Sequence, residues 1–415
     1  MKNVSSRRLA LLLFLGTLPL ACGSSPTPAS PDAGGAAVGD SAAQAPRADQ
    51  RLSTDGASAC PGGIPFSDAT GKVVVSVKIN GAGPYSVFFD SGAPSTVLST
   101  KVTGLPDGAT FELKSVELGQ GVTLGPAKVY SVNFGLGSSI QGILGNDLLE
   151  GKSLTIDYKR NLLRIDPQVD EAALLACAHV AKKPVTLPLT RESGYLYVAG
   201  SVQGLAGQLL LDTGASAGGI SKDVLAESGL KNPVVEGLEL PMSFGTFWAG
   251  YTVVGDITLG SLAVKRLAMY AQPDKMLPPA PTGRTLGVLP YPFLKHFLVT
   301  IDYPHDRLRL DPLAGDAMTE KPSLFGYGLS LSINASGPVK ITRLIAGSPA
   351  EKAGLKVGDQ LVSFDGKDPA ALAPRERIQL VLAMQDGVPV SVTAKRDDKE
   401  TTYALDSADL FVGFP

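Results

Sequence analysis

The sequence is poor in histidine, cysteine and tryptophan, and its charge is nearly balanced. Its 415 residues include three histidines, three cysteines and one tryptophan, with 37 Lys and Arg against 39 Asp and Glu. His179, His296 and His305 are too scattered to indicate a metal site. A formal net charge of −2 gives no reason to expect nucleic acid as a partner. We therefore expect no histidine metal site and no nucleic-acid partner.

The apolar run Leu9–Leu20 is too short to span a bilayer, which needs ~20 apolar residues. It follows three basic residues near the N-terminus and so indicates an export signal. The next residues, Leu-Ala-Cys22-Gly-Ser-Ser, resemble a bacterial lipoprotein cleavage site. The resemblance implies a signal over residues 1–22 and a lipid on Cys22. The protein would then be anchored to a membrane of the bacterial cell envelope, facing the periplasm or the cell surface. Simple secretion with cleavage nearby is the alternative.

Residues 23–60 are expected to form a flexible tether. Most of residues 23–48 are Ala, Gly, Ser or Pro, a composition that cannot bury enough apolar surface to offset its ordering entropy. If Cys22 carries a lipid, Cys60 and Cys177 remain as an even pair in an oxidising compartment. They form either a disulfide or two separate thiols, and the sequence leaves both open.

The chain contains an internal duplication. Residues 85–99 and 207–221 each read as an apolar strand that runs into Asp-Ser/Thr-Gly-Ala. Residues 154–167 and 299–312 share Thr-Ile-Asp-Tyr and end in Asp-Pro. Two matches in the same order predict two equivalent β-rich lobes, at 61–168 and 185–313, joined by a helical connector at 169–184. An aspartate at the end of a buried strand is costly unless its charge is used or paired, so we expect Asp90 and Asp212 to meet.

The two Asp-Ser/Thr-Gly turns resemble the signature of the aspartic proteases, over about residues 65–313. The resemblance implies a catalytic dyad of Asp90 and Asp212, in which one carboxylate activates water and the other carboxyl supplies a proton. Such a dyad requires no metal and no other cofactor. It also implies four supporting residues, the bracing hydroxyls and the close-packed glycines: Ser91, Gly92, Thr213 and Gly214. Alanines at 93 and 215 stand where pepsin-like enzymes commonly place a hydroxyl donor, so we expect an optimum between weakly acidic and neutral pH.

A second element of the family is a hydrophobic-hydrophobic-Gly stretch that packs behind the catalytic turn. Lobe 1 has Ile143-Leu144-Gly145, and lobe 2 has a partial match at Leu286-Gly287. The Asp-to-Gly spacings of 55 (145 − 90) and 75 (287 − 212) are closer to those of retroviral and bacterial members than of pepsin-like ones.

A flap over the substrate is expected in lobe 2, from a glycine- and aromatic-rich segment at 243–251. The flap residues that would bind substrate are Gly245, Phe247, Trp248 and Tyr251. A core-facing aromatic cluster is the alternative. Lobe 1 has only residues 112–121 in the corresponding place, with no aromatic.

The C-terminal part, residues 322–415, resembles a bacterial PDZ domain, a small β-sandwich with two helices. The resemblance rests on Gly-Ser348-Pro-Ala, Ala-Gly354-Leu and Gly-Asp359. Ser348 and Pro349 are expected to start a short helix that Gly354 ends. The resemblance implies that protein C-termini bind by strand addition at Gly326, Tyr327, Gly328 and Leu329, beside a helix at 375–385.

The sequence thus predicts a mainly β protein with two pseudo-symmetric aspartic-protease lobes and a C-terminal PDZ domain. The predicted function is an exported aspartic endopeptidase with peptide or protein substrates. A rival interpretation is an inactive protease-like binding module that acts as a PDZ adaptor in the cell envelope. A dyad formed within one chain, or between the chains of a homodimer, remains open at this point.

Overall fold

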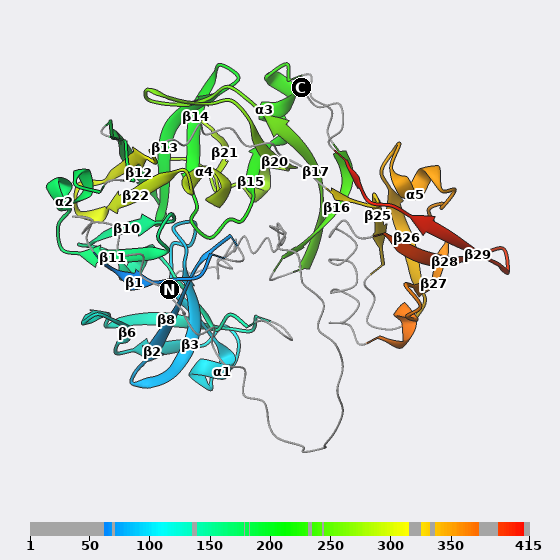
Figure 1. The fold of residues 1–415 in the computed structure, drawn as a ribbon. Coiled ribbons are helices and arrows are strands. Elements are labelled where there is room, and N and C mark those ends of the chain that lie inside the picture. The colour runs from blue at the N-terminus through cyan, green and yellow to red at the C-terminus, as the bar shows by residue number, and fades with distance from the viewer. Residues whose placement is uncertain are drawn as a thin grey trace, which may run out of the picture.

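The computed structural model describes residues 62–68, 71–134, 139–177, 179–181, 183–230, 235–242, 245–314, 325–332, 337–372 and 389–410. For residues 235–242, 245–249 and Phe325 it describes the backbone alone. The predicted signal and tether, with Cys22 and Cys60, lie outside the described residues, as does the predicted helix at 375–385. The described chain is mainly β, as the sequence predicted (Figure 1).

Lobe 1 (residues 61–168) is built around an eight-stranded sheet in the order β5-β8-β4-β9-β3-β2-β6-β7. Its first hairpin turns at Asn80 and Gly81, which have φ of 51° and 81°, as a type I′ turn requires. The strands of this sheet are β2 (Val73–Ile79), β3 (Ala82–Phe89), β4 (Val97–Ser99), β5 (Thr110–Leu113), β6 (Val116–Gly119), β7 (Val122–Leu124), β8 (Ala127–Val132) and β9 (Gly142–Leu144). The lobe also contains β1 (Ile64–Pro65), α1 (Thr100–Thr103), the 3₁₀ helix η1 (Asn146–Leu148), β10 (Ser153–Asp157) and β11 (Leu162–Asp166).

Lobe 2 (residues 185–313) repeats this plan, with its first hairpin turning at Gln203 and Gly204, which have φ of 51° and 79°. Its elements up to the β17 hairpin are β12 (Val185–Glu192), β13 (Tyr195–Val202), β14 (Leu205–Leu211), β15 (Gly218–Ser221), α3 (Lys222–Glu227), β16 (Val235–Met242) and β17 (Gly245–Val254). The remainder are β18 (Ile257–Leu259), β19 (Leu262–Val264), β20 (Leu267–Gln272), η2 (Asp274–Met276), β21 (Thr285–Leu289), α4 (Tyr291–Leu294), β22 (Phe297–Asp302), η3 (Tyr303–His305) and β23 (Arg307–Pro312).

The two lobes share a continuous sheet, in which β1-β11-β10 of lobe 1 is followed by β22-β23-β12 and further strands of lobe 2. At its centre β10 pairs with β22 in antiparallel register, with Thr155 opposite Thr300. These two threonines are the equivalent residues of the repeated Thr-Ile-Asp-Tyr, and their hydroxyls hydrogen-bond at 3.0 Å. The duplicated segment therefore pairs with its own copy about a pseudo-twofold axis, within a single chain.

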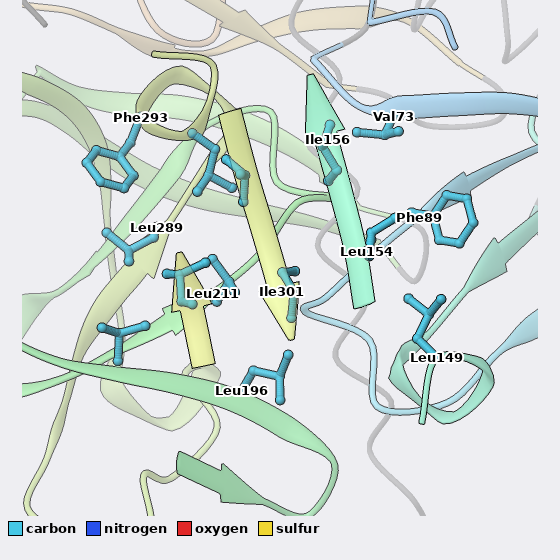
Figure 2. Close-up of a cluster of buried hydrophobic side chains, with 14 of the residues drawn as sticks. Val73, Phe89, Leu149, Leu154, Ile156, Leu196, Leu211, Leu289, Phe293 and Ile301 are labelled. Carbon is cyan, nitrogen blue, oxygen red and sulfur yellow. The ribbon is translucent and has the colours of Figure 1, made fainter. Parts of the chain in front are cut away.

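One hydrophobic cluster continues from lobe 1 through this shared sheet into lobe 2 (Figure 2). Phe89 and Leu211, the residues that precede the two aspartates, both belong to it, together with Ile156 and Ile301 of the shared sheet. All four side chains are fully buried. The position of each aspartate is thus fixed by the packing of the residue before it.

The connector contains α2 (Glu171–Leu175), which Asp170 caps by accepting a hydrogen bond from the Ala173 N–H at 2.9 Å. Cys177 follows this helix, is buried and takes part in a disulfide bond. Because Cys60 lies outside the described residues, the pairing of Cys60 with Cys177 stays a prediction.

The C-terminal unit has its own hydrophobic cluster and its own five-stranded sheet. As predicted, the Ser348 side chain caps a short helix with Pro349 in its first turn, and Gly354 follows that helix with φ of +96°. The elements are β24 (Phe325–Gly326), β25 (Leu329–Leu331), β26 (Val339–Leu344), α5 (Pro349–Lys352), β27 (Gln360–Phe364), η4 (Pro369–Ala371), β28 (Val390–Arg396), β29 (Lys399–Leu405) and β30 (Ala408–Asp409). Of the helices described, none combines the length and apolar character needed to cross a bilayer.

Candidate active site

Asp90 and Asp212 occupy equivalent turns. Asp90 follows β3 and its N–H donates to the Leu144 carbonyl at 3.0 Å, while Asp212 follows β14 and its N–H donates to the Leu289 carbonyl at 3.2 Å. In each lobe the accepting strand, β9 or β21, lies parallel to the strand that carries the aspartate. The two side chains meet, are 4% and 2% exposed, and are hydrogen-bonded to each other.

Two hydroxyls brace these turns across the lobe boundary. The Thr213 hydroxyl accepts from the Ser91 N–H at 3.0 Å and donates to the Phe89 carbonyl at 3.1 Å. Reciprocally, the Ser91 hydroxyl accepts from the Thr213 N–H at 3.0 Å and donates to the Leu211 carbonyl at 2.9 Å. All four bonds are buried, so each replaces water that the groups have lost. This reciprocal bracing is the arrangement that the resemblance led us to expect.

The glycines allow each carboxyl to lie over the opposite turn. A Cβ atom on Gly92 would lie 2.4 Å from Cγ of Asp212, and one on Gly214 would lie 2.4 Å from Cγ of Asp90. Each glycine N–H also donates to the aspartate of its own turn, at 2.8 Å in lobe 1 and 2.9 Å in lobe 2. Any side chain at these two positions would push the carboxyls apart.

The electrostatics of the pair favour one proton shared between two carboxyls. Burial raises the pKa of Asp90, and hydrogen bonds from Asp212 and the Gly92 N–H oppose that rise. Burial, followed by the charge and hydrogen bond of Asp90, raises the pKa of Asp212 well above its usual range. Two carboxylates this close cannot both ionise without strong repulsion. Burial and mutual repulsion therefore favour a state in which the pair holds a single proton.

The structure corrects the predicted hydrophobic-hydrophobic-Gly stretch of lobe 2. Leu144 pairs with Phe89 just before the first aspartate, and Leu289, not Leu286, pairs with Leu211 just before the second. The equivalent of residues 143–145 is therefore 288–290, Val-Leu-Pro, with a proline where lobe 1 has glycine. Matching the sequence to the wrong glycine displaced the prediction by three residues.

Asn146 ties the Asp90 turn to lobe 2, a role that the sequence did not reveal. Its amide nitrogen donates to the carbonyls of Ser91 and Gly194, both at 2.9 Å. Its amide oxygen accepts from the Tyr303 hydroxyl at 2.8 Å. Tyr303 comes from the repeated Thr-Ile-Asp-Tyr, and its counterpart Tyr158 reaches the other way, packing edge-on against Tyr291 of lobe 2. The repeat thus supplies a tyrosine from each lobe to the other.

The predicted flap segment forms a hairpin in which β16 pairs antiparallel with β17. Gly245, Phe247 and Trp248 lie in β17, where the structure describes the backbone alone. Tyr251 is half-buried, and its ring stacks on that of Tyr270 with centroids 4.4 Å apart. That contact anchors the base of the hairpin to β20. Substrate binding by the four flap residues stays a prediction.

The loop at residues 326–329, which is expected to bind peptides, is hydrogen-bonded to the segment at residues 345–350. The Ile345 N–H and the Ser348 hydroxyl donate to the Gly328 carbonyl, and the Ala350 N–H donates to the Tyr327 carbonyl. The Tyr327 ring lies in the core, so only its backbone is available to a ligand, and Leu329 is half-buried. Gly326 is the last residue of β24, and β25 begins at Leu329. Among the described strands β25 is at the edge of its sheet, beside edge strand β16 of lobe 2 (Figure 1).

Two further titratable side chains face the dyad, and the sequence analysis passed over both. Lys72, just before β2, and Tyr195, at the start of β13, each interact electrostatically with both aspartates. Burial, followed by the two carboxylates, raises the pKa of the Tyr195 phenol, which therefore stays neutral.

The described part of the chain contains no group of three or more His, Cys, Asp or Glu side chains that could hold a metal ion.

Comparison with known proteins matches residues 340–393 to the PDZ domain family. The C-terminal unit is a PDZ domain. A carboxyl-terminal-processing protease of Synechocystis sp. is 36% identical over 85 residues, which is 20% of this chain. The match also spans only 20% of that relative's length.

Among solved structures, the aspartic proteinase from Irpex lacteus is similar to this chain with a TM-score of 0.41 and 13% sequence identity. The similarity covers 62% of this chain and 99% of that one.

Proposed function

We propose that the protein is an aspartic endopeptidase whose dyad, Asp90 and Asp212, hydrolyses peptide bonds. The observation that carries the proposal is the meeting of two buried carboxyls on duplicated turns, joined by four buried hydrogen bonds through Ser91 and Thr213. Such bracing fixes the carboxyls relative to each other. Fixed geometry is what general acid–base catalysis needs.

The chemistry follows from the unequal protonation of the pair. The ionised carboxylate takes a proton from a water molecule that attacks the scissile carbonyl. The protonated carboxyl donates a hydrogen bond to the carbonyl oxygen, whose charge grows in the transition state, and later supplies a proton to the leaving amine. Because burial raises the pKa of both carboxyls, the single-proton state should extend to less acidic pH than in an exposed pair.

The test is cleavage of a diverse peptide library between pH 4 and pH 8, read by mass spectrometry. We expect cuts by the wild type that are absent from Asp90→Asn and from Asp212→Asn. Asp223→Asn is a matched control, because Asp223 is exposed on α3 of lobe 2. If both dyad variants retain the wild-type cuts, the dyad is not the catalytic centre.

The rival function is a protease-like module that binds without cutting. The observation in its favour is Pro290, which replaces in lobe 2 the glycine that follows the paired strand in lobe 1. A folded wild-type protein that makes no cuts at any pH in the library assay would support this function.

The PDZ domain is proposed to bind protein C-termini by addition of a strand to β25, with the carboxylate held by backbone N–H groups near Gly328. The partial relative is named as a carboxyl-terminal-processing protease, which is consistent with a domain that handles C-termini. Fluorescence anisotropy would compare peptides with free and amidated C-termini. Equal affinity for the two forms would contradict carboxylate recognition.

Export and lipid attachment at Cys22 are proposed from the N-terminal sequence alone. Metabolic labelling with a tagged fatty acid should mark the wild type and not Cys22→Ser. Label retained by the variant would exclude this anchor, leaving secretion as the alternative.

A further inference from the structure

Lys72 is a buried lysine, only 1% exposed. Lysine is almost never fully buried unless its charge is compensated, because removing an ammonium from water is costly. The two carboxyls of the dyad supply the negative charge in reach of this ammonium. Its Nζ also lies 5.7 Å from the centre of the ring of Phe88, two residues before Asp90.

Strand register makes Lys72 the counterpart of Tyr195. Val74 pairs with Phe88, two residues before the first aspartate, and Tyr197 pairs with Leu210, two residues before the second. Lys72 precedes Val74 by two residues, and Tyr195 precedes Tyr197 by two residues. The duplicated lobes thus present a cation at the dyad from lobe 1 and a neutral phenol from lobe 2.

The lobe boundary encloses the Lys72 position. The preceding residue, Gly71, packs so closely against lobe 2 that an added Cβ would lie 3.0 Å from Cβ of Ser216 and 3.3 Å from the Tyr291 ring. Farther along the chain, within β2, Ser76 and Lys78 are exposed. Burial of Lys72 is therefore a product of the meeting of the lobes at the dyad.

We propose that Lys72 is a positioning residue that holds the dyad in its state with one proton, by neutralising the single negative charge of that state. The inference rests on the proposed catalytic function of the dyad. With one proton on two carboxyls and an ammonium beside them, the three groups together carry no net charge. Loss of that one proton would leave a net charge of −1 in a buried site, and gain of a second proton would leave +1.

The other titratable groups around the dyad do not supply this charge. Burial raises the pKa of Tyr158, Tyr195 and Tyr303, so their phenols stay neutral. The neighbouring carboxylates are held elsewhere, Asp147 by the N–H and hydroxyl of Thr96 and Asp68 by the Tyr291 hydroxyl and the Asn161 amide. Burial lowers the pKa of Lys72 to about 8 while Asp90 and Asp212 oppose the fall, and the ammonium in turn lowers the pKa of both carboxyls.

The test compares three variants. Lys72→Met removes the charge, Lys72→Arg keeps it, and Lys78→Met removes a charge from an exposed position in the adjoining strand β2. The first readout is the pH profile of kcat/KM for peptide cleavage. Loss of a nearby cation should move both limbs of the profile upward by ~1 pH unit in Lys72→Met. Lys72→Arg should return both limbs toward the wild-type position, and Lys78→Met should not move them.

The second readout does not depend on turnover. Carbon-13 NMR follows the carboxyl groups of labelled aspartate, with Asp90 and Asp212 assigned from their asparagine variants. Higher carboxyl midpoints in Lys72→Met with no cleavage by the wild type would support the electrostatic role and reject the protease function. Cleavage by the wild type with unchanged midpoints and unchanged limbs in Lys72→Met would overturn the role of Lys72 alone.

If Lys72→Met does not fold, titration of the Lys72 ammonium itself tests the proposal. Interacting groups shift each other, so removing both carboxylates in Asp90→Asn/Asp212→Asn should lower the midpoint of the Lys72 ammonium, read by nitrogen-15 NMR. An ammonium midpoint that is the same in the wild type and the double variant would overturn the proposal.

Discussion

The hydroxyl bracing of the Asp90 and Asp212 turns predicts how much stability Thr213→Val loses. Valine has nearly the same shape as threonine, so the substitution removes the hydroxyl without opening a large cavity. It leaves the Ser91 N–H and the Phe89 carbonyl without the partners that they have at 3.0 and 3.1 Å. Both residues are buried, at 2% and 0% exposure, so water cannot replace the lost partner.

Each buried group left unsatisfied costs about 1–3 kcal/mol, so two such groups predict a loss of ~2–6 kcal/mol in the free energy of unfolding. Whole domains are typically stable by only about 5–15 kcal/mol. The variant should therefore unfold at a clearly lower urea concentration. Far-UV circular dichroism and the fluorescence of Trp248, the single tryptophan of the chain, would follow the transition.

Thr258→Val is the matched control, because its hydroxyl hydrogen-bonds Ser201 on the exposed face of lobe 2. Water replaces an exposed partner, so the control should change the free energy of unfolding by less than ~0.5 kcal/mol. Equal stability losses in Thr213→Val and Thr258→Val would refute the argument that the lobes are joined by buried hydrogen bonds at this turn.

Three further predictions concern the dyad and the PDZ domain. Gly214→Ala places a Cβ 2.4 Å from Cγ of Asp90, and because the carboxyls must separate we expect peptide cleavage to fall at least ~100-fold. Because the pKa of Asp212 is raised in the folded protein, its contribution to stability is complete below the unfolded value of ~3.9 and is lost as pH rises through the folded value. The melting temperature of Asp212→Asn relative to the wild type should therefore increase from pH 4 to pH 8. In the PDZ domain the Arg396 guanidinium holds the pKa of Asp359 below its usual range, a contribution present above pH ~3.9 and lost as pH falls through the folded value. Asp359→Asn should therefore lower the unfolding temperature of that domain at pH 7 and have progressively less effect as the solution is acidified.

Matched substitutions separate these effects from general damage. Gly62→Ala adds a Cβ that meets nothing within 4 Å, so cleavage should be unchanged. Asp398→Asn removes the carboxylate of an exposed ion pair with Lys395 and should leave the PDZ unfolding temperature nearly unchanged at pH 7. Cleavage by Gly214→Ala at the wild-type rate, a pH-independent difference for Asp212→Asn, or no loss in Asp359→Asn would each contradict the corresponding reasoning.

Much of the architecture could be predicted because it is encoded in local patterns and in repetition. Positive φ at Asn80 and Gly81 follows from the turn chemistry of Asn-Gly, and the PDZ helix begins and ends where Ser348 and Gly354 indicated. The two copies of Thr-Ile-Asp-Tyr predicted equivalent elements, and the structure pairs them directly, with Thr155 opposite Thr300. The dyad within one chain is a consequence of that pairing.

The sequence by itself determined two equivalent turns carrying Asp90 and Asp212, because an apolar strand that runs into Asp-Ser/Thr-Gly is a local signal. Only the tertiary structure decided what else lies around them. Alternation along β2 assigns Lys72 to the same side of the strand as the exposed Ser76 and Lys78, and the approach of lobe 2 buries it instead. The match of Pro290 to Gly145 likewise required strand register, since the sequence offered a nearer glycine. Burial and long-range pairing depend on which segments meet in space, and a single sequence records that only where a segment is repeated.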